Sequence, residues 1–176
     1  MNTSHQRGFN LLELMIGISV LGILFAIGVP SFNEMIRNNT VVSNTNELVV
    51  ALSMARSEAV RRGLPVSVCG SNAAQTACVG AAQPNWANGW LVFTDATGGA
   101  GVVNGPADEI LQSFDAVPGG IALTTNDLGF VRFAATGLPT VETIFTVKHA
   151  QCTGNNRRTV RITVTGRVNT NKVACS

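Results

Sequence analysis

The longest hydrophobic run in the sequence lies near its start. Between Leu11 and Val29, 19 residues carry a single charge, on Glu13. A helix of this length spans roughly 29 Å, about the thickness of the hydrocarbon core of a bilayer. The short polar flank before it has Arg7 as its one fixed charge, and positively charged flanks stay in the cytoplasm. The pattern therefore predicts a transmembrane helix with the rest of the chain beyond the membrane.

A second hydrophobic pattern follows, with the spacing of an amphipathic helix. Apolar or small residues recur at intervals of three and four, which predicts one face on a core. This stripe consists of Val41, Thr45, Leu48, Leu52, Ala55 and Ala59, widened by Val42 and Val49. Glu58 and Arg62 are spaced to pair on the helix surface, and Gly63 with Pro65 predicts the helix end. We expect Pro30 to kink the helix, since proline lacks an N–H and clashes with the preceding turn.

Beyond Gly63 the pattern changes to short runs of β-forming residues separated by Gly-, Asn- and Pro-rich segments. The predicted strands are 65–69, 89–94, 109–114, 120–125, 130–134, 144–152 and 158–168. One long helix followed by short strands predicts an α+β fold, with the helix packed on antiparallel sheet. The Gly-rich run TGGAGVVNGPAD has no Gly-Lys-Ser/Thr ending, so it indicates a hairpin loop and not a phosphate cradle.

Composition changes this picture little: 45% of residues are hydrophobic and 12% charged.

Two ordinary interpretations of the first helix are a secretory signal peptide and a plain uncleaved anchor. Ala26-Ile27-Gly28 is a weak match to a signal-peptidase site, and Pro30 follows it closely. Neither interpretation explains Glu13, because a charge in a transmembrane helix costs about 2.5–3.5 kcal/mol and usually has a function.

The N-terminal stretch resembles that of type IV pilins and type II secretion pseudopilins. The matching residues are Gly8, Phe9, Leu12, Glu13, Leu14 and Pro30. The resemblance implies that a prepilin peptidase cuts after Gly8 on the cytoplasmic side and N-methylates Phe9. The apolar helix then stays in the mature chain, with Glu13 as the fifth residue after the cut.

Such processing gives Glu13 a physical role. Cleavage creates an ammonium group at Phe9, and the Glu13 carboxylate of one subunit can pair with the Phe9 ammonium of its neighbour when helices bundle. Opposite charges attract strongly in a medium of low dielectric constant, where an unpaired charge is costly. The pair would favour assembly and set the axial stagger of subunits. The alternative is that Glu13 serves only peptidase recognition.

The later sequence resembles a smaller group within these pilins and pseudopilins. The segments LSMARSEAVRRGLPVSVC and WANGWLVFTD are similar to the H-type pseudopilins and the FimT/FimU minor pilins, with the Trp86 to Trp90 spacing as the most telling feature. The resemblance implies a pilin-like fold and a low-copy subunit near a filament tip. It divides the chain into a leader (1–8), a transmembrane and assembly helix (9–31), an amphipathic continuation (32–62) and a β-rich domain (63–176).

Four cysteines lie outside the apolar helix, in the part predicted to occupy an oxidising compartment. Four cysteines allow three pairings, and the sequence-local one joins Cys69 to Cys78 and Cys152 to Cys175. A zinc site is the alternative, although there is no Cys-x-x-Cys pair and only His149 is nearby.

Charge is distributed unevenly along the chain. Residues 9–147 hold five basic and all ten acidic residues, a net charge of −5, whereas 148–176 hold six basic and no acidic residues. The six are Lys148, Arg157, Arg158, Arg161, Arg167 and Lys172. Alternation along the last predicted strand would place Arg157, Arg161 and, if the strand persists, Arg167 on the outer face. Lys148 would point outward on the preceding strand, and Arg158 would be exposed beside the turn. Such a row of cations could follow the phosphate backbone of double-stranded DNA.

Transformation-type FimT proteins carry Gly-Arg-x-Arg near the C-terminus. Here the corresponding stretch is Gly166-Arg167-Val168-Asn169, so Asn169 replaces the second arginine, and Lys172 follows three residues later.

Three functions follow: a minor pilin that assembles or primes a type IV pilus, a pilus-associated DNA receptor for natural transformation, and an H-type pseudopilin of type II secretion. All share one fold. We expect no catalysis and no cofactor, since His149 has no evident partner acid or nucleophile motif. The expected partners are the prepilin peptidase, other major and minor pilins, the bacterial inner membrane before assembly and, for the receptor, DNA. The β-rich domain would lie in the periplasm until assembly into a pilus or pseudopilus.

Overall fold

The computed structural model describes residues 10–80, 85–97, 100–103, 105–126 and 129–175. The chain forms two compact units, residues 1–37 and 38–176. One helix, α1 (Leu11–Arg62), begins in the first unit and ends in the second. Pro30 lies inside α1, which continues through it, so the kink at Pro30 stays a prediction.

The second unit is built on the later part of α1, and its helical stripe is confirmed. All six predicted stripe residues are buried, together with Asn44 and Ala51. The small residues Ala51, Ala55 and Ala59 are fully buried and belong to the same core cluster as residues of both sheets. At the helix end, Gly63 adopts a left-handed φ of 66° and its N–H bonds the carbonyl of Ala59, as expected for a C-terminal cap.

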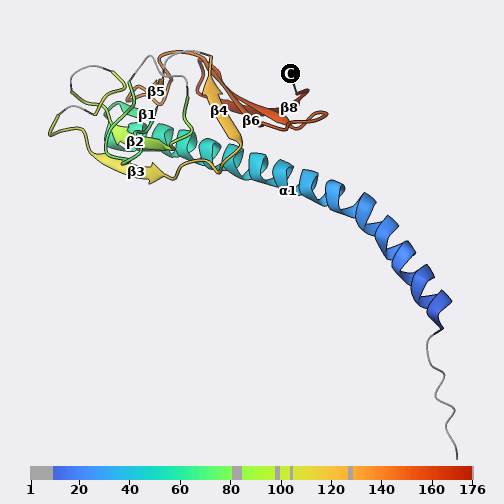
Figure 1. Cartoon of the computed structure of the whole chain (residues 1–176). Helices are drawn as coiled ribbons and strands as arrows, with labels where there is room; N and C mark the ends of the chain where they lie inside the picture. The colour runs from blue at the N-terminus through green and yellow to red at the C-terminus, as the bar shows by residue number, and fades with distance from the viewer. Residues whose placement is uncertain (1–9, 81–84, 98–99, 104, 127–128, 176) are drawn as a thin grey trace, which may run out of the picture. The chain divides into compact units, whose positions relative to one another are not determined.

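In the described residues, eight strands form two antiparallel sheets along this part of α1 (Figure 1). The first sheet has the order β3-β2-β1-β5 and the second the order β4-β6-β7-β8. The strands of the first sheet are β1 (Val66–Gly70), β2 (Trp90–Thr94), β3 (Ile110–Phe114) and β5 (Phe130–Phe133). Those of the second are β4 (Ile121–Thr125), β6 (Thr143–His149), β7 (Arg157–Ile162) and β8 (Val168–Val173). The α+β architecture is as predicted.

The predicted strand over 158–168 is wrong, because it is two strands with a turn between them. Thr163 N–H bonds the carbonyl of Arg167 at 3.0 Å and closes the β7–β8 hairpin. Gly166 lies in this turn with a φ of 74°, a backbone conformation that residues other than glycine rarely adopt. The turn was not predicted because the stretch from Thr159 to Thr165 is rich in β-branched residues and its alternation continues the strand pattern up to the glycine.

The core joins both sheets to the helix. Trp86 is fully buried and meets the ring of Phe145 edge-on at 4.7 Å, which links the loop before β2 to the second sheet. Trp90 is also buried and stacks on Phe114 of β3. Phe93 lies on the opposite side of β2, in a smaller cluster with Cys69 and Leu91. The two tryptophans of the WANGW stretch therefore belong to the core.

Candidate functional site

The predicted processing site, Gly8 and Phe9, lies outside the described residues. Glu13 is described and occupies the first turn of α1, with an exposed side chain. The N-terminal end of a helix carries partial positive charge, so a carboxylate in its first turn is stabilised there.

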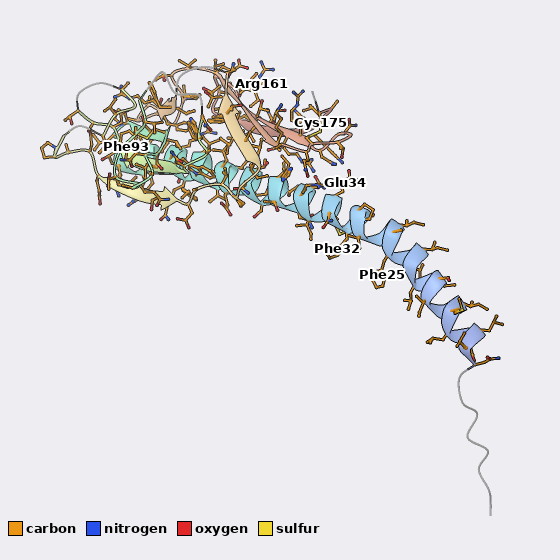
Figure 2. All side chains as sticks on the ribbon, in the orientation of Figure 1. Phe25, Phe32, Glu34, Phe93, Arg161 and Cys175 are labelled. Carbon is orange, nitrogen blue, oxygen red and sulfur yellow. A yellow bond between two sulfur atoms is a disulfide. The ribbon has the colours of Figure 1, made fainter. Side chains whose placement is uncertain are left out.

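The first unit exposes an apolar surface. Its large hydrophobic side chains are mostly more than half exposed, as for Phe25 and Phe32, which project from the ribbon in Figure 2. Among the described residues, α1 is the helix long and apolar enough to cross a membrane. A surface of this kind is stable only against lipid or other apolar helices.

Both predicted disulfides are present. Cys69 bonds Cys78, and Cys152 bonds Cys175. The first closes the loop after β1, and the second ties the segment after β8 to the loop after β6. No cysteine is free, so the alternative of a cysteine-ligated zinc site is wrong for this structure.

The six basic candidates do not form one surface. In antiparallel pairing, residues directly opposite each other point to the same face. Arg158 lies opposite Val147 of β6 and Lys172 of β8, and Val147 is fully buried. We call the face shared by Val147, Arg158 and Lys172 the inner face of the second sheet, and the opposite one the outer face. Arg158 is half-buried and follows the inner face, so the prediction that it is exposed beside the turn is wrong.

The outer face carries Lys148, Arg157 and Arg161, as predicted from their alternation. Thr146 and Thr159 lie opposite each other between them. Arg161 extends from the sheet on its side away from α1 (Figure 2) and forms an ion pair with Glu142. The absence of acids from 148–176 did not reveal this partner, because Glu142 precedes that segment and reaches Arg161 only across the β6–β7 pairing.

Arg167 lies in the β7–β8 turn and not on a strand, so its predicted place in the outer-face row is wrong. The turn is held from below by the helix: Arg56 donates from Nη1 to the carbonyl of Gly166 at 2.7 Å. A Cβ added at Gly166 would lie 2.9 Å from the carbonyl oxygen of Gly137 and 3.0 Å from Arg56 Cζ. The glycine of the Gly-Arg motif therefore has a structural reason, independent of any ligand.

A buried ionic network sits at the end of β2. Asp95 is 1% exposed and accepts hydrogen bonds from Ser67 Oγ at 2.5 Å and from the main-chain N–H of Gly101 at 3.0 Å. Arg132 of β5 pairs with the same carboxylate at 3.4 Å and also donates to the main-chain carbonyl of Asp95. These contacts fix the start of the β2–β3 loop, and we read the network as structural.

His149 ends β6, where its Nδ1 accepts a hydrogen bond from the N–H of Gln151 at 3.0 Å. Across the described residues there is no group of three or more His, Cys, Asp or Glu side chains placed to hold a metal ion.

Two family models match this chain. The model described as "Type II transport protein GspH" matches residues 44–166, and the "Prokaryotic N-terminal methylation motif" matches residues 3–29. The chain belongs to the GspH family. The GspH match covers the later part of α1 and the strands through the β7–β8 turn, and the methylation motif covers the apolar helix with Glu13.

Solved structures share the GspH-type fold. A crystal structure of the type IV minor pilin FimU from Pseudomonas aeruginosa PAO1 is 20% identical, with a TM-score of 0.57, and the match covers 76% of this chain and 89% of that one. A second crystal form gives a TM-score of 0.54 over 73% of this chain and 90% of FimU. At this identity the likeness shows the fold alone. The apolar helix, the prepilin motif and the pilin fold together fit an inner-membrane-anchored pilin that is assembled into a pilus.

Two curated relatives, both named "Fimbrial protein" and from Pseudomonas aeruginosa, are 38% identical over 58 residues. That match covers 33% of this chain and 37% of each relative, so the chain spans little more than a third of their length.

Sequence reasoning missed two long-range contacts of this GspH-family domain. The Asp95–Arg132 pair joins residues 37 positions apart, and the Arg56–Gly166 bond joins residues 110 apart. Asp95 does follow a buried strand directly, which is a signal for a carboxylate held at a strand end. The sequence around Arg56 does not indicate its hydrogen-bond partner. From its position on the helix, Arg56 could equally be an exposed cation.

Proposed function

We propose that this chain is a minor type IV pilin of the FimT/FimU kind, which helps to assemble or prime a pilus as a low-copy subunit near its tip. The observation that carries the proposal is the joining, in one chain, of the N-terminal methylation motif to a GspH-type domain. The crystal structure of FimU shows that a type IV minor pilin has a fold of this kind. The chain would be a substrate of the prepilin peptidase, a partner of other pilins and not itself an enzyme.

In this proposal residues 1–8 are the leader, 9–31 the transmembrane and assembly helix, 32–62 its amphipathic continuation and 63–176 the β-rich domain. Cleavage after Gly8 would leave N-methylated Phe9 as the first residue. Glu13 would then pair with the Phe9 ammonium of a neighbour, as opposite charges do in an apolar bundle.

Processing is tested by intact-mass analysis of the chain extracted from membranes. A mass that begins at methylated Phe9 is expected, and replacing Gly8 with a bulky residue should block maturation. A retained leader, or a cut beyond the apolar helix, would contradict the assignment.

Assembly is tested with Glu13→Ala. This change removes the one charge of the apolar run, from the first turn of α1, so insertion should be intact while crosslinking to other pilins falls. Glu34→Ala, outside the apolar run, is the matched control. Undiminished crosslinking of the Glu13 variant would show that Glu13 does not act through pairing.

A second candidate function is binding of double-stranded DNA during natural transformation, and the outer face supports it. Lys148, Arg157 and Arg161 share that face with small threonines, and such rows bind phosphate backbones without sequence preference. The ion pair of Arg161 with Glu142 would have to open or tolerate a phosphate. Arg158 and Lys172 follow the other face, and Arg167 the turn, so these three candidates would contribute less.

DNA binding is tested by titrating the full-length chain in detergent with duplex DNA at two salt concentrations. Affinity should fall steeply with salt and after Lys148→Gln with Arg157→Gln. Glu142→Gln should raise affinity by freeing Arg161, whereas Glu47→Gln, on the exposed side of α1, should not. If DNA affinity does not change with salt or with these substitutions, the DNA-binding proposal is contradicted and only the assembly role remains.

A third candidate, an H-type pseudopilin of type II secretion, is supported by the description of the matching family model, "Type II transport protein GspH". It requires the same peptidase and the same fold. Crosslinking in cells that carry both machines, scored for pilus against secretion subunits, would separate it from the pilin proposal.

A further inference from the structure

The second sheet ends in an open strand. β8 pairs with β7 through all six residues of its register, without a bulge. The outer side of β4 is occupied by the Asn85–Thr124 bridge, and that of β5 by the Phe133–Pro139 bridge. In the described part of the chain, no strand or bridge occupies the outer side of β8. A regular edge without proline is a template for a further strand.

The hairpin bond shows which backbone groups β8 offers. Since Thr163 and Arg167 form a hydrogen-bonded pair, alternation makes Asn169, Asn171 and Val173 the residues that bond to β7. The N–H and C=O groups of Val168, Thr170 and Lys172 then point away from the sheet. Thr170 and Lys172 are exposed, so these groups are open to a partner.

The same residues carry their side chains on the inner face, beside an unusual pair of charges. Arg158 and Lys172 are directly opposite each other on β7 and β8, where like charges repel. The Nε of Arg158 is buried and has no hydrogen-bond partner. Within the described residues, neither side chain takes part in an ion pair. An anionic group at this place would offset the repulsion between the two cations.

We propose that the edge of β8 binds an extended, acidic segment of a neighbouring filament subunit by strand addition. The main chain of that segment bonds Val168, Thr170 and Lys172, and its carboxylates, at every second position, meet Lys172 and Arg158. Strand addition gives affinity through the backbone and specificity through alternate side chains. A nucleic acid has no backbone that continues a β-ladder, so the open edge favours a peptide. The identity of the partner as a filament subunit rests on the proposed function, whereas the peptide site does not.

The test uses the full-length chain in detergent and two fluorescent probes: a short synthetic peptide with valine and glutamate alternating, and its counterpart with glutamine in place of glutamate. The chain should bind the glutamate peptide about tenfold more tightly, as expected for charge-assisted hydrogen bonds. Bound peptide should slow hydrogen exchange at the amides of Thr170 and Lys172.

Thr170→Pro removes an N–H that points away from the sheet, a place where an edge strand tolerates proline. It should abolish peptide binding, while Thr170→Ala, which keeps the N–H, should bind as the original chain does. Lys172→Glu should reverse the preference, binding a lysine-containing peptide over the glutamate peptide, and it keeps the test valid if the proline variant does not fold.

The proposal is overturned if both peptides bind equally, if Thr170→Pro binds like Thr170→Ala, or if duplex DNA but no peptide protects these amides. Peptide binding together with failed filament incorporation would instead contradict the proposed function and leave the peptide site standing.

Discussion

The guanidinium of Arg56 donates a 2.7 Å hydrogen bond to the main-chain carbonyl of Gly166, joining the helix to a turn 110 positions later in the chain. Two features of the turn require glycine at position 166. Its φ is 74°, and a Cβ there would come too close to Arg56 and to the Gly137 carbonyl. Helix and hairpin are thus locked together at the end of the second sheet where Arg167 lies.

Gly166→Ala should therefore lower the free energy of unfolding by about 2 kcal/mol or more, combining left-handed strain with the close contact. Gly154→Ala is the matched control, because Gly154 has a φ of 59° with no atom within 4 Å of an added Cβ. The control should lose only about 1 kcal/mol. Denaturant unfolding measures both, and equal losses would show that the contact with Arg56 and Gly137 does not matter.

Arg132→Met should destabilise the chain by roughly 3 kcal/mol, because it leaves the buried Asp95 carboxylate without its cation. Asp95→Asn in the same chain should recover part of that loss, since the charge goes and the amide can still accept from Ser67. Arg167→Met, at an exposed position, is the control and should change stability by less than about 0.5 kcal/mol. Additive losses in the Arg132 and Asp95 variants would contradict a coupled pair.

Replacing Cys152 and Cys175 with serine should cost about 3 kcal/mol in the chain-entropy model, since the bond closes a loop between residues 23 apart. Hydrogen exchange should rise first in β8 and the following segment, and least in the helical stripe that contains Leu48 and Leu52. Replacing Cys69 and Cys78 is the comparison, and it should affect β1. Faster exchange across the helix in the Cys152 variant would show that the bond supports the whole core.

The Glu58 carboxylate should titrate far below an ordinary glutamate. Hydrogen bonds from Arg61 and then Arg62 lower its pKa from 4.5 to about 2. A lowered folded-state pKa gives stability that is present above about pH 4.5 and is lost as the pH falls toward about 2. Carboxyl NMR of Glu58 should show the low midpoint, and Arg61→Gln with Arg62→Gln should return it toward 4.5. A midpoint near 4.5 in the original chain would mean that solvent screens these exposed pairs.

The sequence predicted the helix well because its signals are local and periodic. Spacing alone placed Leu48, Leu52 and Ala55 on the buried face, and Gly63 gave the end of the helix. The strand limits mostly agree within one to three residues for the same reason. The division of the strands into two sheets was not predictable from one sequence, because which strands become neighbours depends on contacts distant in the chain.

The site was predicted less well, and the reason is register. Counting charges placed six cations in one segment, but alternation along β7 puts Arg158 and Arg161 on opposite faces, and the β7–β8 register puts Lys172 on the face of Arg158. One residue of shift exchanges the faces of a strand. The ion pair between Arg161 and Glu142 depends on the same register. Counting charges along the chain therefore could not predict it.

The connection from α1 to β1 has a mechanical consequence. After Arg62 the chain passes through only Gly63–Pro65 before it enters β1, which is paired on one side with β2 and on the other with β5. A pull transmitted along this part of the helix therefore reaches a strand that is clamped at both edges, and that strand can slide only if both ladders break together. Tension along a pilus would therefore act on the interior strand of the first sheet. The exposed β8 edge, in the second sheet, would not carry this force.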